Sequence, residues 1–78
     1  MSVKRGAKIK GPYLLDEVAL LKEIPARGLA RGQVGTVVEK LDSHTILVEF
    51  SDVEGRAVEF APCRRSDLLV LRYSVSRR

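Results

Sequence analysis

Apolar and polar residues alternate along two consecutive stretches in the middle of the chain, as they do in β-strands with one buried face. Residues 36–41 are rich in β-branched side chains, which favour strands. In residues 45–50, Ile46, Val48 and Phe50 occupy alternate positions and therefore share one face. A short polar segment, Asp-Ser-His, separates the two stretches. The pattern predicts a β-hairpin whose second strand turns these three side chains into the core.

A third strand is predicted over residues 56–61, after a loop that contains Gly55. Val58 and Phe60 share one face of this segment, and we expect that face to enter the core. Pro62 is expected to end the strand, because proline has no N–H to donate to a ladder. The three strands together predict an antiparallel meander.

The first third of the chain is less regular. The apolar residues of the run YLLDEVALL lie at helical spacing, but the run is short and a proline follows it. We therefore expect a turn over residues 14–16 and a strand over residues 17–22. Residues 24–35 contain a proline and three glycines and are predicted to form a loop. Leu29 and Val34 are expected to attach this loop to the core.

A last strand is predicted over residues 68–72, which gives five short strands separated by turn signals. Such a series is typical of a small all-β barrel or sandwich, and closing the sheet removes the exposed edges of an open one. A chain of 78 residues is long enough for one domain. We place this domain at residues 11–72, with flexible basic tails at residues 1–10 and 73–78.

The net charge of +4 at pH 7 does not come from the predicted domain. Residues 11–71 contain seven basic and ten acidic residues, so this stretch has a net charge of −3 and the tails carry the excess of basic residues. Basic tails are more often solvated than bound to nucleic acid. The single cysteine excludes an internal disulfide, and no apolar run reaches the roughly 20 residues of a membrane helix. We expect a soluble, cytoplasmic protein that does not contact a membrane.

Residues 31–39, RGQVGTVVE, begin a wider resemblance. A glycine, a short gap and then Gly-Thr-Val-Val at the start of a strand resemble the KOW motif and the matching turn of other SH3-like barrels. Between positions 13 and 71 the chain is similar to an uncharacterised bacterial family of small barrels, known only as a domain of unknown function. The segments that carry this similarity are residues 14–20, Pro25 and residues 32–38, 48–50 and 67–71. The resemblance implies a single five-stranded SH3-like barrel and brings no established activity.

A weaker similarity connects the chain with SH3-like subunits that accompany electron-transfer enzymes. Examples are the small stromal subunit of photosystem I, the variable chain of ferredoxin–thioredoxin reductase and the nitrile hydratase β-subunit. The shared features are the Val-Gly-Thr-Val turn, the Val-Glu-Phe strand and the final Asp-Leu strand. Because these relatives are docking or assembly subunits without a cofactor of their own, the resemblance implies an accessory role.

Few residues of the chain are suited to catalysis. Cys63 and His44 are single residues on predicted loops, and the neighbouring Arg64 and Arg65 are expected to lower the pKa of the thiol. An enzyme that depends on Cys63 is the weakest of our hypotheses. One cysteine and one histidine do not supply a four-ligand zinc site, and the carboxylates do not cluster. We predict a protein that is not an enzyme and binds no metal or cofactor.

Two functions stay open on the sequence. The first is a non-catalytic interaction module that binds a protein partner through its loops. The second is a nucleic-acid-binding barrel, whose candidate surface consists of five basic residues: Lys22, Arg27, Arg31, Arg64 and Arg65. The negative central stretch and the lack of an aromatic stacking platform weigh against the second function. Homo-oligomerisation through an uncapped sheet edge, or through Leu15 and Val53, is a further possibility.

Overall fold

The computed structural model describes residues 11–52, 54–55 and 58–71. The predicted tails, Val53 and the last residue of the final predicted strand lie outside these ranges. The strands are β1 (Glu17–Leu20), β2 (Val34–Lys40), β3 (Thr45–Ser51), β4 (Val58–Arg64) and β5 (Leu68–Val70), and two 3-10 turns accompany them, η2 (Pro25–Arg27) and η3 (Arg65–Asp67). The described residues form no α-helix, so the all-β prediction is confirmed.

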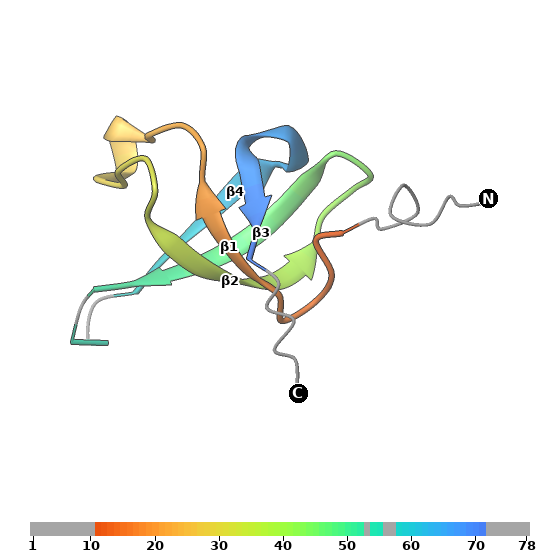
Figure 1. Cartoon of the computed structure of the whole chain (residues 1–78), viewed down its shortest axis with the longest axis horizontal. Helices are drawn as coiled ribbons and strands as arrows, with labels where there is room; N and C mark the ends of the chain where they lie inside the picture. The colour runs from red at the N-terminus through yellow and green to blue at the C-terminus, as the bar shows by residue number, and fades with distance from the viewer. Residues whose placement is uncertain (1–10, 53, 56–57, 72–78) are drawn as a thin grey trace, which may run out of the picture.

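The five strands form one antiparallel sheet in the order β4-β3-β2-β1-β5 (Figure 1). Strands β2, β3 and β4 are the predicted meander, and β5 pairs with β1 on the other side of the sheet. Within the described ranges no ladder joins β4 to β5, so both are edge strands. The predicted closure into a barrel is therefore not confirmed.

Alternate side chains of the strands form the core on one face of the sheet. Ile46, Val48 and Phe50 of β3 are buried, as predicted, and they pack in one cluster with Val18 of β1 and Val37 of β2. None of these five is more than 1% exposed, although the described strands form a single sheet. The sheet bends around this cluster (Figure 1), and Leu29 and Ile24 of the loop between β1 and β2 also pack against it. A register shift between β2 and β3 just after Val37 contributes to this bend.

Strand β4 extends further than the sequence predicts. Instead of ending before Pro62, it continues through this residue to Arg64, and Pro62 pairs with Leu47 of β3. The physical reason is that β4 is an edge strand, where a residue whose nitrogen faces away from the sheet has no ladder bond to donate. Proline is therefore tolerated inside β4, and the predicted end of the strand is wrong.

The two faces of β4 are also reversed relative to the prediction. Ala61 and Cys63 are buried, whereas Val58 and Phe60 are 45% and 49% exposed. Residues that lie directly opposite in an antiparallel pair share a face, and Ala61 lies opposite the buried Val48. The pairing register thus turns small side chains inward on this strand and places Phe60 on the outer face.

The loop between β1 and β2 is ordered by its own backbone hydrogen bonds. Ile24 and Leu29 exchange two of them, at 2.8 and 3.1 Å, and η2 lies between these residues. Gly28 ends η2 with a positive φ of 70°, a conformation that glycine adopts without strain. Leu29 is buried and attaches the loop to the core, as predicted, but Val34 is exposed, because the alternation of β2 turns its neighbour Gly35 inward.

Arg27 connects this loop to the edge strand β4. Its Nη1 atom donates hydrogen bonds to Glu59 Oε2 at 2.9 Å and to the carbonyl oxygen of Phe60 at 3.2 Å. An ion pair this exposed contributes at most about 1 kcal/mol to stability. The contact nevertheless occupies a carbonyl of the edge strand, and Pro62 removes a donor from the same strand. Both features disfavour the predicted pairing of two chains through this edge.

Candidate functional site

The structure does not gather the five predicted basic residues around one hollow. Arg64 and Arg65 line one hollow, Lys22 and Arg64 line a second, and Arg27 lines a third. Arg31 is exposed and lines none of these three. Arg27 is also neutralised by the acid of β4 that it contacts. Lys22, Arg64 and Arg65 are therefore the predicted residues that the fold places around neighbouring hollows.

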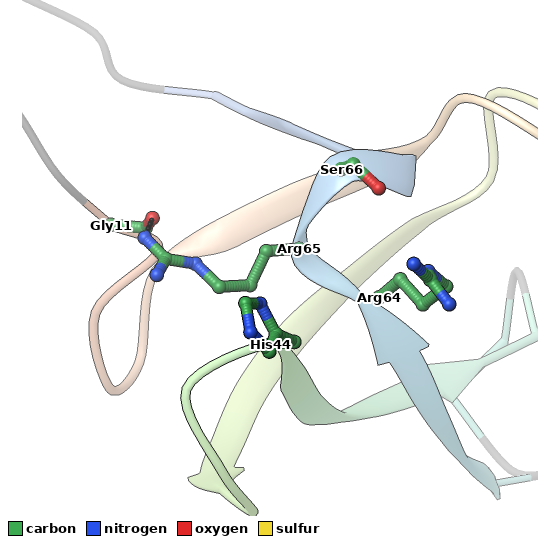
Figure 2. Close-up of a pocket in the computed structure, with 5 residues that line it drawn as sticks. All are labelled: Gly11, His44, Arg64, Arg65 and Ser66. Carbon is green, nitrogen blue, oxygen red and sulfur yellow. Dashed lines mark hydrogen bonds between the residues drawn. The ribbon is translucent and has the colours of Figure 1, made fainter.

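The hollow with two arginines has a volume of about 370 Å³ and is called here the basic cleft. It lies where the end of β4 and the start of η3 meet the turn between β2 and β3 (Figure 2). Its lining residues are Gly11, His44, Arg64, Arg65 and Ser66. None of them is acidic, so the cleft has no carboxylate of its own to offset the arginines.

Arg65 is the best-fixed side chain of the basic cleft. Its guanidinium donates hydrogen bonds to the carbonyl oxygen of Ser43 at 3.2 Å and to that of Gly11. Its backbone N–H donates to the carbonyl oxygen of His44 at 2.9 Å. Figure 2 shows the side chain extending toward Gly11 above the His44 ring. All three acceptors are neutral carbonyl groups, so these bonds set the position of Arg65 without neutralising its charge.

The predicted polar turn between β2 and β3 brings His44 to the cleft. Asp42 Oδ1 accepts a hydrogen bond from the His44 N–H at 2.7 Å, which is the local side-chain bond that favours aspartate in turns. This bond is the main reason that the pKa of Asp42 lies below its usual value. The turn also receives support from the Leu41 N–H, which donates to the carbonyl oxygen of Thr45 at 2.9 Å.

The remaining side chains of the cleft do not form a catalytic group. In Figure 2, Arg64 and Arg65 leave the chain in opposite directions, so their guanidinium groups do not converge. In Figure 2 the Ser66 hydroxyl is turned to the side of Arg64, and no hydrogen bond joins it to His44 in the described part of the chain. A serine nucleophile needs a base within hydrogen-bond reach. The arrangement is suited to holding an anion and lacks the geometry of nucleophilic catalysis.

A second hollow, of about 250 Å³, lies on the other side of Arg64. Apolar side chains of β1, of β4 and of the loop between β1 and β2 form part of it, and charged residues complete it. The lining residues are Leu20, Lys22, Glu23, Ile24, Pro62, Cys63, Arg64 and Asp67. Two of these charged residues are acidic and two are basic, so the second hollow has no net charge of one sign.

Cys63 lies on β4 facing the core, and not on a loop as predicted. It is only 4% exposed, and its Sγ lies 3.5 Å from the carbonyl oxygen of Ala61. Burial raises the pKa of the thiol, the charge of Asp67 raises it further, and only Arg27 acts in the opposite direction. The expectation that Arg64 and Arg65 lower this pKa is therefore wrong, because the thiol faces away from solvent.

Native Cys63 is expected to resist thiol reagents. A buried thiol with a raised pKa presents little thiolate, so maleimide at neutral pH should label the folded chain many times more slowly than the chain in denaturant. Mass spectrometry of timed samples measures both rates. Rapid labelling of the folded chain at the rate of a free thiol would contradict the burial of this residue.

Three consecutive apolar residues, Tyr13, Leu14 and Leu15, form an exposed turn before β1, called here the 13–15 knuckle. Asp16 closes the turn: its Oδ2 accepts from the Tyr13 N–H at 2.8 Å, and its N–H donates to the Tyr13 carbonyl at 2.9 Å. The Leu15 N–H donates to the carbonyl oxygen of Val37 at 2.8 Å, which fixes the knuckle to β2. The three side chains are 51%, 62% and 72% exposed.

Leu15 is the one non-glycine residue of the described ranges with a positive φ, at 70°. Turns with a positive φ at their third position usually have glycine or asparagine there. For other residues the left-handed conformation costs roughly 1–2 kcal/mol, because the Cβ atom approaches the following carbonyl oxygen. The sequence predicts the turn and the exposure of Leu15, but nothing in its pattern indicates this strained backbone.

Comparison with known proteins identifies one family. A family model described as a domain of unknown function, DUF4926, matches residues 14–70. The chain belongs to this family. The family predicted from the sequence is therefore confirmed, and the DUF4926 match includes all five strands, the two leucines of the knuckle and both arginines of the basic cleft. No curated protein and no solved structure gives a significant match.

The DUF4926 domain shows no metal-binding group of three or more histidine, cysteine, aspartate or glutamate side chains within residues 11–52, 54–55 and 58–71. The same part of the chain has no helix with the length and apolar character needed to cross a membrane. The family description assigns no activity. Function must therefore be argued from the basic cleft and the 13–15 knuckle.

Proposed function

We propose that this DUF4926 domain is a non-catalytic interaction module that binds a protein partner through the 13–15 knuckle. The observation that carries the proposal is Leu15, a large apolar side chain that is both strained and exposed. Strained backbone conformations cluster at functional sites, where the surrounding structure maintains them. Here the hydrogen bonds to Asp16 and to β2 maintain the turn.

The energetics of the knuckle favour a partner over packing within the chain. Leu14 and Leu15 are 62% and 72% exposed, so the strain at Leu15 is not repaid by burial in this domain. Complete burial of a leucine side chain against a partner contributes about 1.5–3 kcal/mol. Tyr13, which is 51% exposed beside the two leucines, is of a residue type that is enriched among the anchors of protein interfaces. A protein surface with an apolar pocket is thus the natural ligand of this turn.

We further propose that the domain is an SH3-like barrel of the bacterial, cytoplasmic kind to which the sequence shows resemblance. The order β4-β3-β2-β1-β5 supports this, because the last strand returns to the first and the bent sheet encloses its own core. Arg27 reaches from the β1–β2 loop to β4, which also draws the two sides of the sheet together. A buried free thiol, Cys63, suits a reducing compartment.

Nucleic-acid binding receives less support from the distribution of charge. An extended phosphate backbone needs a continuous positive track. In this domain Arg27 is paired with Glu59, and Arg64 and Arg65 point in opposite directions. Arg31 lines none of the three hollows. Phe60 is exposed, but it is a single ring opposite Glu49 on the outer face of the sheet. We therefore retain nucleic acid as the alternative ligand.

The proposal is tested by photo-crosslinking from the knuckle. A benzoylphenylalanine placed at Leu14 of the full chain, expressed in the cell that makes the protein, is expected to form a discrete adduct with one protein. The matched control carries the same probe at Leu69, which is 51% exposed on β5. An adduct that forms from position 14 and not from position 69 supports the proposal. The same adducts from both positions, or none from position 14, would contradict it.

A further inference from the structure

We infer that the basic cleft binds a carboxylate group of the partner, so that the partner's binding segment is an acidic peptide with apolar neighbours. This inference rests on the proposed function and specifies the chemistry of its ligand. The cleft combines a guanidinium with no acidic residue in its described lining, a histidine ring and a serine hydroxyl in a hollow of about 370 Å³. Each of these groups offers hydrogen-bond donors to an anion.

Arg65 is positioned before any ligand arrives. Its guanidinium is hydrogen-bonded to the carbonyl oxygens of Ser43 and Gly11, which belong to two separate segments of the chain. A guanidinium has five N–H donors, and these two bonds leave others for a carboxylate. Because the side chain is already fixed, binding an anion loses little conformational entropy. The hydrogen bond that results is charge-assisted and stronger than one between neutral groups.

The surroundings of the cleft favour a single carboxylate over a chain of phosphates. Glu23 and Asp67 line the adjoining hollow on the other side of Arg64. The same hollow is lined by Lys22 and Arg64, so on this side the positive surface does not continue and the next phosphates of a nucleic acid would gain no net attraction. A peptide with one acidic side chain places its only negative charge inside the cleft and needs no such continuation. The ligand with the better charge complementarity is thus an acidic peptide.

The basic cleft and the 13–15 knuckle are adjacent along the chain. Gly11, whose carbonyl oxygen fixes Arg65, precedes Tyr13 by two residues, a distance of at most about 7 Å along the backbone. One short segment of a partner can therefore contact both features at once. The expected partner segment places an acidic residue in the basic cleft and neighbouring apolar residues against Leu14 and Leu15.

The inference is tested by NMR titration of the full chain with three probes. The first is a capped tripeptide with one glutamate between two leucines, the second has glutamine in place of the glutamate, and the third is a ten-nucleotide oligothymidine. We expect the glutamate peptide to shift the amide signals of His44, Arg65 and Ser66 and to bind about tenfold more tightly than the glutamine peptide. The oligonucleotide is expected to bind the cleft more weakly than the glutamate peptide.

Two variants of the full chain assign the effect to the cleft. Ser66→Glu places a carboxylate at the exposed edge of the cleft without removing the bonds of Arg65, and it should weaken the glutamate peptide about fivefold or more. Arg31→Gln reduces the net charge of the protein by one unit away from the cleft and should change binding less than twofold. Thermal unfolding of each variant is measured to check that it is folded.

Four results would overturn the inference: equal affinity for the two peptides, equal effects of the two variants, tighter binding of the oligonucleotide in the cleft, or no shift of the cleft signals with any probe. None of these results bears on the proposed function, because the crosslinked adduct from position 14 tests that function separately. If the adduct forms in the Ser66→Glu variant as it does in the unaltered chain, the knuckle binds a partner without the cleft. If no adduct forms in either, the proposed function itself fails.

Discussion

Replacing Gly35 with alanine is expected to destabilise the domain by about 1–3 kcal/mol or more. A Cβ atom at this position would lie 2.7 Å from Phe50 Cδ1, 2.7 Å from Val48 Cγ1 and 2.8 Å from the carbonyl oxygen of Glu49. Two of these neighbours are buried core side chains, and the third belongs to the backbone of β3, the strand paired with β2. None of them can move without disturbing the sheet, so the added methyl group overpacks the core.

Gly32→Ala is the matched control for this prediction. Gly32 has a φ of 88°, and a Cβ atom there would meet nothing within 4 Å. Its substitution therefore costs only the strain of the left-handed conformation, roughly 1–2 kcal/mol. Urea denaturation followed by circular dichroism measures both variants. A Gly35→Ala variant no less stable than the native chain would show that the sheet is not packed as described.

The second large expected effect is a difference in stability between alanine variants of the two phenylalanines. Phe50→Ala is expected to cost about 3–5 kcal/mol, because the ring is 1% exposed and its removal leaves a cavity in the core. In a domain of this size such a loss leaves little net stability. Phe60→Ala should cost less than about 1 kcal/mol, because its ring is half exposed on the outer face of β4.

The same denaturation experiment decides between the two faces of β4. The sequence pattern predicts that both rings are buried, in which case the two substitutions would have similar and large effects. The structure predicts a difference of several-fold in the free energy lost. Comparable losses from Phe50→Ala and Phe60→Ala would mean that the register between β3 and β4 is incorrect.

Much of the sheet is predictable from local pattern. Alternation in residues 45–50 identifies the buried face of β3, because this strand pairs on both sides and faces the core on one. The prediction fails for β4, where the larger side chains Val58 and Phe60 face outward. The buried face of a strand depends on its register with the neighbouring strand. For an edge strand that has apolar residues on both faces, the sequence pattern does not specify this register.

The candidate site is less predictable, because its residues come together only in the folded chain. The positive charge of Arg27, identified from the sequence, is used within the domain by Glu59, a contact between residues 32 positions apart. Arg65 is fixed by carbonyl groups of two distant segments, which no sequence spacing indicates. The strained backbone of Leu15 depends on its bond to β2. Single-sequence patterns describe local preferences, and these three features are set by tertiary contacts.

Leu15, at its strained and exposed position, is proposed to bind a partner directly, and one variant tests this proposal. Asparagine is tolerated in the left-handed conformation, so Leu15→Asn should relieve strain while removing little buried surface. The measurement is the melting temperature of this variant together with its yield of the adduct from position 14. We predict a melting temperature higher by roughly 4–8 °C for each kcal/mol of strain relieved, and loss of the adduct. An unchanged adduct yield in a stabilised variant would show that Leu15 does not contact the partner and would contradict the claim.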